Sequence, residues 1–135
     1  MLSVNSYDKK YVNDCRVKVN ALLSTYRDVL SAKPLAAMKA FEPHVFNHMV
    51  PALNDYFCHR ARAMEGKDGN ALNEVRILAN SVASADGTFQ LDKTIKYDPA
   101  KSILSYKIGD KVSLSADEFT RLSQAFFVEI EPKYP

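Results

Sequence analysis

The chain has 135 residues, of which 47% are hydrophobic and 25% charged, and 18 Lys and Arg against 16 Asp and Glu give a formal net charge of +2. These proportions are those of one soluble globular domain and exclude a disordered, collagen-like or disulfide-rich chain. The near balance of charge argues against nucleic acid as a partner, because nucleic-acid-binding proteins carry a marked basic excess. No apolar run approaches the about 20 residues that cross a bilayer, so no membrane partner is expected either.

The cysteines and the amino terminus predict the compartment. Residues 1–10 lack the apolar core of a signal peptide. Cys15 and Cys58 are too few for a disulfide framework and do not form a C-x-x-C motif. We therefore expect the protein in the reducing cytoplasm.

The first long segment predicts a helix. Apolar residues recur at spacings of three and four from Val12 to Leu30, which is the pattern of one buried helix face. Ser6 is placed to cap its start, and Pro34 ends it, because the residue before a proline avoids the α region. A short helical turn is expected over residues 35–41.

Two further helices are predicted to form an antiparallel αα-hairpin. The first is expected to begin at Pro43 and to run to Glu65, with a kink at Pro51 where a backbone donor is missing. Glycines and polar residues over 66–70 indicate a loop, and Asn70 is placed to cap the next helix, whose apolar residues follow at helical spacing.

The period of the apolar residues then changes to two. Over residues 88–114 apolar and polar residues alternate, which predicts about three antiparallel strands in a small β-meander. Turns are expected at Asp98-Pro99 and at Gly109-Asp110, where the glycine supplies a positive φ. Ser115 and Glu118 have the spacing of a capping box and predict a last helix, closed by Pro132.

The predicted architecture is therefore one α+β domain over residues 1–135. Its helical part spans about 6–86, its β-meander about 88–114, and a carboxy-terminal helix over about 116–131 packs back on the rest.

All three histidines lie on the second predicted long helix, on the face opposite its core. His44 and His48 are an i, i+4 pair, and so are Asp55 and His59. At about 1.5 Å per residue, His48 and His59 are about 16 Å apart, so the two pairs cannot share one ion. Each pair offers two ligands where zinc needs three or four. His44 and His48 are thus weak metal candidates beside a plain solvated face, and no cofactor is expected.

A dense polar cluster surrounds the hairpin loop, between residues 59 and 76. A helix amino terminus after a glycine-containing loop favours an anion, and arginine suits a carboxylate or a phosphate. The candidate ligand-binding residues are His59, Arg62, Lys67, Asp68, Asn70, Asn73 and Arg76. The alternative is a structural clamp of Arg–Glu pairs and loop caps. Arg60 falls on the apolar face and must be paired if it is buried, and Glu74 is its expected partner.

The segments around this cluster carry a resemblance. Residues 57–62, 65–70 and 72–76, which read FCHRAR, EGKDGN and LNEVR, resemble part of a family of small bacterial proteins without an established activity. The resemblance implies a bacterial cytosolic protein and assigns no catalytic residue.

No nucleophile elbow, dinucleotide-binding loop or Walker motif occurs in the sequence. We therefore expect a non-catalytic binding or interaction module that self-associates as a homo-oligomer. The alternative is an enzyme or a binder of a small anionic ligand that uses the cluster at residues 59–76.

Overall fold

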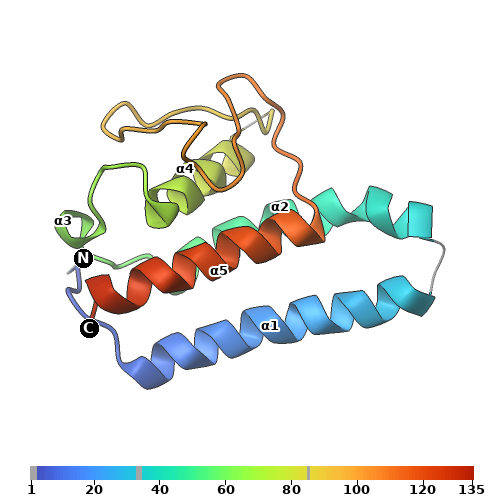
Figure 1. Cartoon of the computed structure of the whole chain (residues 1–135), viewed down its shortest axis with the longest axis horizontal. Coiled ribbons are helices and arrows are strands. Elements are labelled where there is room, and N and C mark those ends of the chain that lie inside the picture. Colours follow the sequence, from blue (N-terminus) through green and yellow to red (C-terminus); the bar gives the residue numbers. More distant parts are fainter. Residues whose placement is uncertain (1–2, 33–34, 85) are drawn as a thin grey trace.

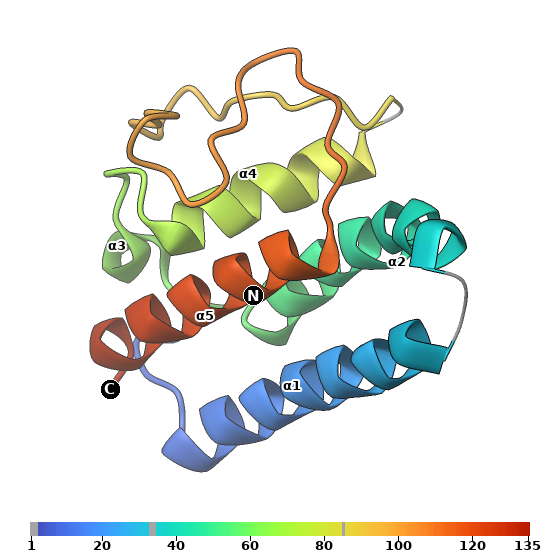
Figure 2. The same ribbon diagram turned by 45° about the vertical axis from the view of Figure 1, so that its right-hand side comes forward.

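A computed structural model describes residues 3–32, 35–84 and 86–135. This part of the chain contains five helices: α1 (Lys9–Ala32), α2 (Leu35–Tyr56), α3 (Arg62–Glu65), α4 (Ala71–Ala83) and α5 (Ala116–Lys133). Figure 1 shows α1 on one side of the molecule, α5 and α2 beside it, α4 beyond them, and the long connection between α4 and α5 lying over α4. The same layers are seen after rotation in Figure 2.

Helix α1 buries the face that its sequence pattern predicts. Its buried residues are Val12, Cys15, Val19, Leu23 and Tyr26. The helix begins at Lys9, after Asp8, whose carboxylate accepts a hydrogen bond of 2.8 Å from the Lys10 amide. Asp8 therefore takes the place that the sequence suggests for Ser6. The expected stop at Lys33-Pro34 lies outside the described residues.

Helix α2 differs from its prediction at both ends. The turn expected over 35–41 and the helix expected from Pro43 are one helix that begins at Leu35, and Pro43 and Pro51 both lie inside it. It ends at Tyr56 and not at Glu65. The reason is a competing backbone pairing, in which the amide of Val4 donates to His59 and the amide of Ala61 donates to Val4. These bonds draw residues 59–61 out of the helix, and α3 follows as a separate turn.

The predicted αα-hairpin is present in the form of α2 and α4. Figure 1 shows α4 running back along α2, and the two helices pack against each other. Asn70 caps α4 as expected, because its side-chain oxygen accepts hydrogen bonds from the amides of Leu72 at 2.9 Å and Asn73 at 3.2 Å.

The predicted β-meander is wrong, and with it the α+β class. The described residues contain no strand, and their bridges, Val4 with Arg60 and Thr88 with Lys111, are isolated. The alternation over 88–114 is only partly reflected in burial: Phe89, Ile95, Val112 and Leu114 are buried, but Ile108 is exposed. The fold is helical, with one long irregular connection packed on α4.

Side chains of α4 accept hydrogen bonds from the backbone of this connection. In a sheet, the backbone of a neighbouring strand would accept these bonds. The amide of Gln90 donates to Ser81 at 3.0 Å, and the amides of Ile103 and Leu104 donate to Glu74 at 2.8 and 2.9 Å. Buried backbone donors must find partners, and here α4 supplies them.

The expected turns of this segment do form. The amide of Lys101 donates to the Asp98 carbonyl at 3.0 Å. The second turn is centred one residue earlier than predicted, on Ile108-Gly109, because the Asp110 amide donates to the Lys107 carbonyl at 3.0 Å. Gly109 supplies the positive φ of 91° that the turn requires.

Helix α5 begins as predicted, with both hydrogen bonds of the Ser115–Glu118 capping box formed. It extends two residues past the predicted end at 131, with Pro132 inside its last turn. It packs back on α1, α2 and α4. The largest fully buried side chains at the centre of the fold are aromatic: Tyr134, Phe46, Phe57, Phe89, Phe119 and Phe126. None of the helices in the described ranges is long and apolar enough to span a bilayer.

Candidate functional site

The centre of the predicted polar cluster is an ion pair that the sequence assigns wrongly. Arg60 is buried and its Nε donates to Glu65 Oε1 at 2.8 Å, not to Glu74. Its other donors reach the carbonyl of Phe57 at 3.0 Å and the side-chain oxygen of Asn54 at 2.9 Å. Glu74 faces the other way and binds the long connection. The turn after α2, which places Arg60 and Glu65 side by side, is the reason for the difference.

Glu65 is shared by two arginines. Arg76 donates two hydrogen bonds to its carboxylate, of 2.6 and 3.1 Å, and Asn73 donates a third of 2.8 Å. Burial by itself raises the pKa of Glu65, but the hydrogen bond from Arg76 and the charges of Arg60 and Arg76 outweigh it and hold the pKa below its usual value. The carboxylate stays ionised and fully engaged.

The loop of the hairpin is built around the same carboxylate. The Asn70 side chain donates to the backbone carbonyl of Glu65 at 2.8 Å and to Asp68 at 2.7 Å. The Asn73 side-chain oxygen accepts from the amide of Gly69 at 2.9 Å. A Cβ at Gly69 would lie 2.4 Å from the carbonyl oxygen of Lys96, so the close approach of the two backbones requires glycine.

The seven predicted ligand-binding residues therefore divide into two groups. Asp68, Asn70, Asn73 and Arg76 belong to a network in which protein groups occupy their hydrogen-bonding atoms. His59, Arg62 and Lys67 are exposed, and Arg62 lies 3.7 Å from Asp92. The structural clamp that the sequence leaves open matches this arrangement more closely than a ligand pocket does.

His44 and His48 are exposed on α2. The prediction that His59 lies on the same helix is wrong, because α2 ends at Tyr56 and the exposed His59 follows it. Among the described residues no group of three His, Cys, Asp or Glu side chains is close enough to share a metal ion. His44 and His48 therefore gain no third protein ligand in this part of the chain.

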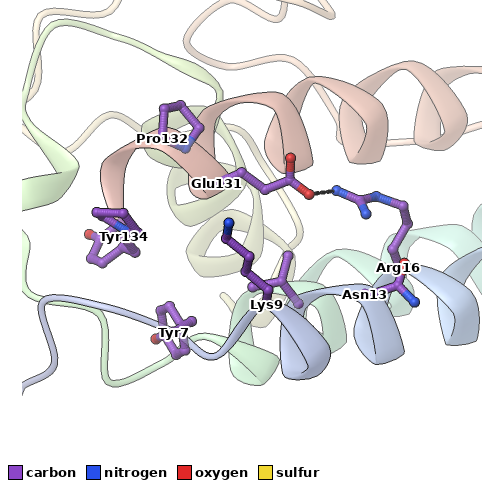
Figure 3. Close-up of a pocket in the computed structure, with 9 residues that line it drawn as sticks. Tyr7, Lys9, Asn13, Arg16, Glu131, Pro132 and Tyr134 are labelled. Carbon is purple, nitrogen blue, oxygen red and sulfur yellow. Dashed lines mark hydrogen bonds and ion pairs between the residues drawn. The ribbon is translucent and has the colours of Figure 1, made fainter.

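A groove of about 650 Å³ lies elsewhere, between the first turns of α1 and the last turns of α5 (Figure 3). Its walls are mostly apolar. It is lined by Tyr7, Lys9, Val12, Asn13, Arg16, Glu131, Pro132, Tyr134 and Pro135. At one side Arg16 forms an ion pair with Glu131 and lies over the Phe127 ring, 4.9 Å from its centroid. Figure 3 shows the Lys9 side chain extending between Glu131 and Tyr134.

Two tyrosines form the end of the groove where the chain termini meet. Tyr7 and Tyr134 have ring centroids 5.6 Å apart, and the Tyr134 hydroxyl donates to the Ala61 carbonyl at 2.8 Å. The Tyr7 hydroxyl is buried without a hydrogen-bond partner among the residues that the structure describes. Burial raises the pKa of both tyrosines to about 12.

No family model, curated protein or solved structure matches this chain. The resemblance of residues 57–76 to small bacterial proteins accordingly stays an expectation. The chemistry of the molecule has to be argued from its own groove, cavities and polar network.

Sequence reasoning misses the groove because its walls come from the two ends of the chain. Arg16 and Glu131 are 115 positions apart, and no local motif links them. The role of Glu65 as the centre of the network is missed for a different reason. The helical pattern carries α2 through residue 65, and on that helix Arg60 and Glu65 lie more than 100° apart.

Proposed function

We propose that the protein is a non-catalytic binding module that holds a small ligand in the groove between α1 and α5. The observation that carries this proposal is the groove itself, whose volume of about 650 Å³ and apolar walls with a few polar groups fit the usual form of a small-molecule site. The polar cluster at residues 59–76 is the weaker candidate for a ligand site, because its central groups are already paired with one another.

The groove favours an amphipathic carboxylate as its ligand. Tyr7, Pro132 and Pro135 offer an apolar and aromatic surface to the body of such a molecule. The Lys9 ammonium and the Asn13 amide at the mouth offer donors to its charged end. The proposal takes up the small anionic ligand that the sequence analysis gives as its alternative, but at the groove and not at residues 59–76.

The groups in the groove support binding more than catalysis. Tyr7 and Tyr134, with pKa values of about 12, keep their protons at neutral pH and are poor general bases. Arg16 and Glu131 neutralise each other. We also propose that the module acts in the cytoplasm and self-associates.

Binding to the groove is tested with a series of phenylacetate, indole-3-acetate and octanoate, each compared with its neutral amide. In a titration followed by nuclear magnetic resonance, we expect saturable shifts of the Tyr7, Val12 and Tyr134 amides with a carboxylate. Lys9→Gln is expected to weaken binding about fivefold to tenfold, because it removes a charged hydrogen bond.

The matched control is Lys10→Gln. Lys10 is the next residue of α1, but it pairs with Asp14 at 2.6 Å and does not line the groove. It is expected to bind as the unmodified protein does. Shifts that do not saturate, or an equal loss in the two variants, would refute the groove as the site.

A further inference from the structure

A second cavity, of about 400 Å³, opens between α2, the end of α4 and the long connection, which contributes Asp86, Gly87 and residues 111–113. It shares no lining residue with the groove between α1 and α5. The side chains and backbone around it belong to Pro43, His44, Asn47, His48, Val82, Ser84, Asp86, Gly87, Lys111, Val112 and Ser113.

The lining of this cavity includes donors from both of its walls. His44 and His48 come from successive turns of α2, and Lys111 comes from the connection. Each imidazole offers an N–H donor whatever its protonation state, and the lysine offers three. The hydroxyl of Ser113 adds one more donor to the lining, whereas that of Ser84 donates to the Ser81 carbonyl at 2.6 Å.

The position of the Lys111 ammonium is fixed from the side of the connection. Its Nζ donates to the Asp86 carbonyl, which leaves two of its three protons for another acceptor. A Cβ at Gly87 would lie 3.7 Å from this nitrogen, so the ammonium rests beside the bare backbone of that glycine. The lining also includes one carboxylate, Asp86, which accepts a hydrogen bond of 3.1 Å from the Thr88 amide.

The two walls are tied together by Asn47. Its side-chain nitrogen donates to the Val112 carbonyl at 2.9 Å, and its oxygen accepts from the Leu114 amide at 2.9 Å. On the opposite side the Val112 amide donates to the Gly87 carbonyl at 3.0 Å. The backbone directly after Lys111 is thus attached both to α2 and to Gly87, which is the preorganisation that a binding site needs.

We propose that this cavity binds a phosphate-type oxyanion through His44, His48 and Lys111. A tetrahedral oxyanion presents several acceptors at once, and donors on both walls can reach different oxygens of one such group. The volume leaves room for an organic body, so the group can belong to inorganic phosphate or to a small phosphate monoester. A metal fits less well, because within the described residues the two histidines have no third ligand.

The test is a titration of the protein with inorganic phosphate, phenyl phosphate and, at matched ionic strength, chloride, followed by the amide resonances. We expect saturable shifts at Gly87, Lys111 and Ser113 with the phosphates and not with chloride. Tighter binding of phenyl phosphate than of phosphate would assign the site to a monoester, and equal binding would assign it to the free anion.

Four variants make the assignment specific. Lys111→Ala and His48→Ala are each expected to weaken phosphate binding about tenfold, as the loss of a hydrogen bond to a charged group does. Lys107→Ala, at an exposed lysine of the same connection, and His59→Ala, at an exposed histidine after α2, lie outside the cavity and should bind normally. The altered side chains are exposed in all four, so the fold is expected to persist.

Two results would overturn the proposal. One is the absence of saturable shifts with either phosphate. The other is equal affinity in Lys111→Ala, His48→Ala and their controls. The groove between α1 and α5 contains none of these residues, so the carboxylate titration tests the proposed function independently of this result.

Discussion

Glu65 has no contact with solvent, yet its carboxylate is ionised and accepts hydrogen bonds from Arg60, Arg76 and Asn73. Such a pair stabilises a fold little when compared with apolar residues of the same volume, but removing one partner leaves a buried charge uncompensated. Glu65 therefore compensates the positive charges of Arg60 and Arg76 at the point where α2, α3 and α4 meet.

Glu65→Gln is expected to lower the free energy of unfolding by about 3 to 5 kcal/mol, because Arg60 stays buried without its counter-charge. Urea denaturation at pH 7 measures this change. The control is Glu129→Gln, which removes a partly exposed pair with Lys133 at 3.8 Å and should cost less than about 1 kcal/mol. Similar losses in the two variants would show that the buried network carries no special weight.

The pH dependence of stability follows from the same residue. The pKa of Glu65 is lower in the folded protein than in the unfolded chain, so its contribution is complete above the unfolded value of about 4.3. It is lost as the pH falls through the lower, folded pKa. Between pH 5 and pH 2 the stability of Glu65→Gln should therefore fall less than that of the unmodified protein.

At the scale of whole elements, the connection between α4 and α5 is held by individual helix side chains. Asn47 of α2 binds the backbone at Val112 and Leu114, and Glu74 of α4 binds the amides of Ile103 and Leu104. Burial raises the pKa of Glu74, and the two amides offset this only in part. Its stabilising contribution is therefore complete below pH about 4.3 and declines as the pH rises through the raised pKa.

The two attachments should be separable by amide hydrogen exchange. Asn47→Ala is expected to remove the protection of the Leu114 amide and leave that of Ile103 and Leu104. Glu74→Ala is expected to do the reverse. Each loss corresponds to about 1 to 3 kcal/mol, which is the cost of leaving a buried donor without its partner. Joint loss of protection at both places in either variant would mean that the connection opens as one unit.

These attachments also explain which elements the sequence predicts well. The spacing of apolar residues predicts α1 and α5, which each bury one face, and α4, which is buried on most sides but keeps its apolar residues at helical spacing. Caps such as Asn70 and Ser115 act within a few residues. Over 88–114 alternation marks buried residues such as Phe89 and Val112, but it fails at Ile108, which is 71% exposed, and it does not predict the backbone partners. Those partners, Glu74 and Asn47, lie 29 and 67 positions away from the amides they bind, and only tertiary structure brings them there.

The candidate sites divide in the same way. The polar residues at 59–76 are close in sequence, so the sequence predicts that they form a cluster. It does not predict that the Glu65 carboxylate accepts the hydrogen bonds of Arg60, Asn73 and Arg76. The groove joins Lys9 of α1 to Glu131 of α5, and the second cavity joins His48 of α2 to Lys111 of the connection. Both depend on how helices distant in sequence pack together.

At the scale of the whole molecule, exposed apolar side chains occur in the last turn of α1 and the first two turns of α2, at the right-hand end of the molecule in Figure 1. Val29, Leu35 and Phe41 are 41%, 55% and 52% exposed. Leu30 and Met38 are half-buried behind them. An apolar surface of this kind is self-complementary when two copies meet about a two-fold axis, because each presents the same residues to the other.

The self-association expected from the sequence is therefore predicted to occur through this end. In sedimentation velocity, the unmodified protein should show a sedimentation coefficient that rises with concentration. The double variant Leu35→Gln with Phe41→Gln should remain a monomer over the same range, because the apolar area that drives association is reduced.

Ile108→Gln is the control, since it removes a side chain that is 71% exposed on the α4–α5 connection. It should associate as the unmodified protein does. A concentration-independent monomer before any substitution would rule out self-association, and persistence of association in the double variant would place the interface on another face.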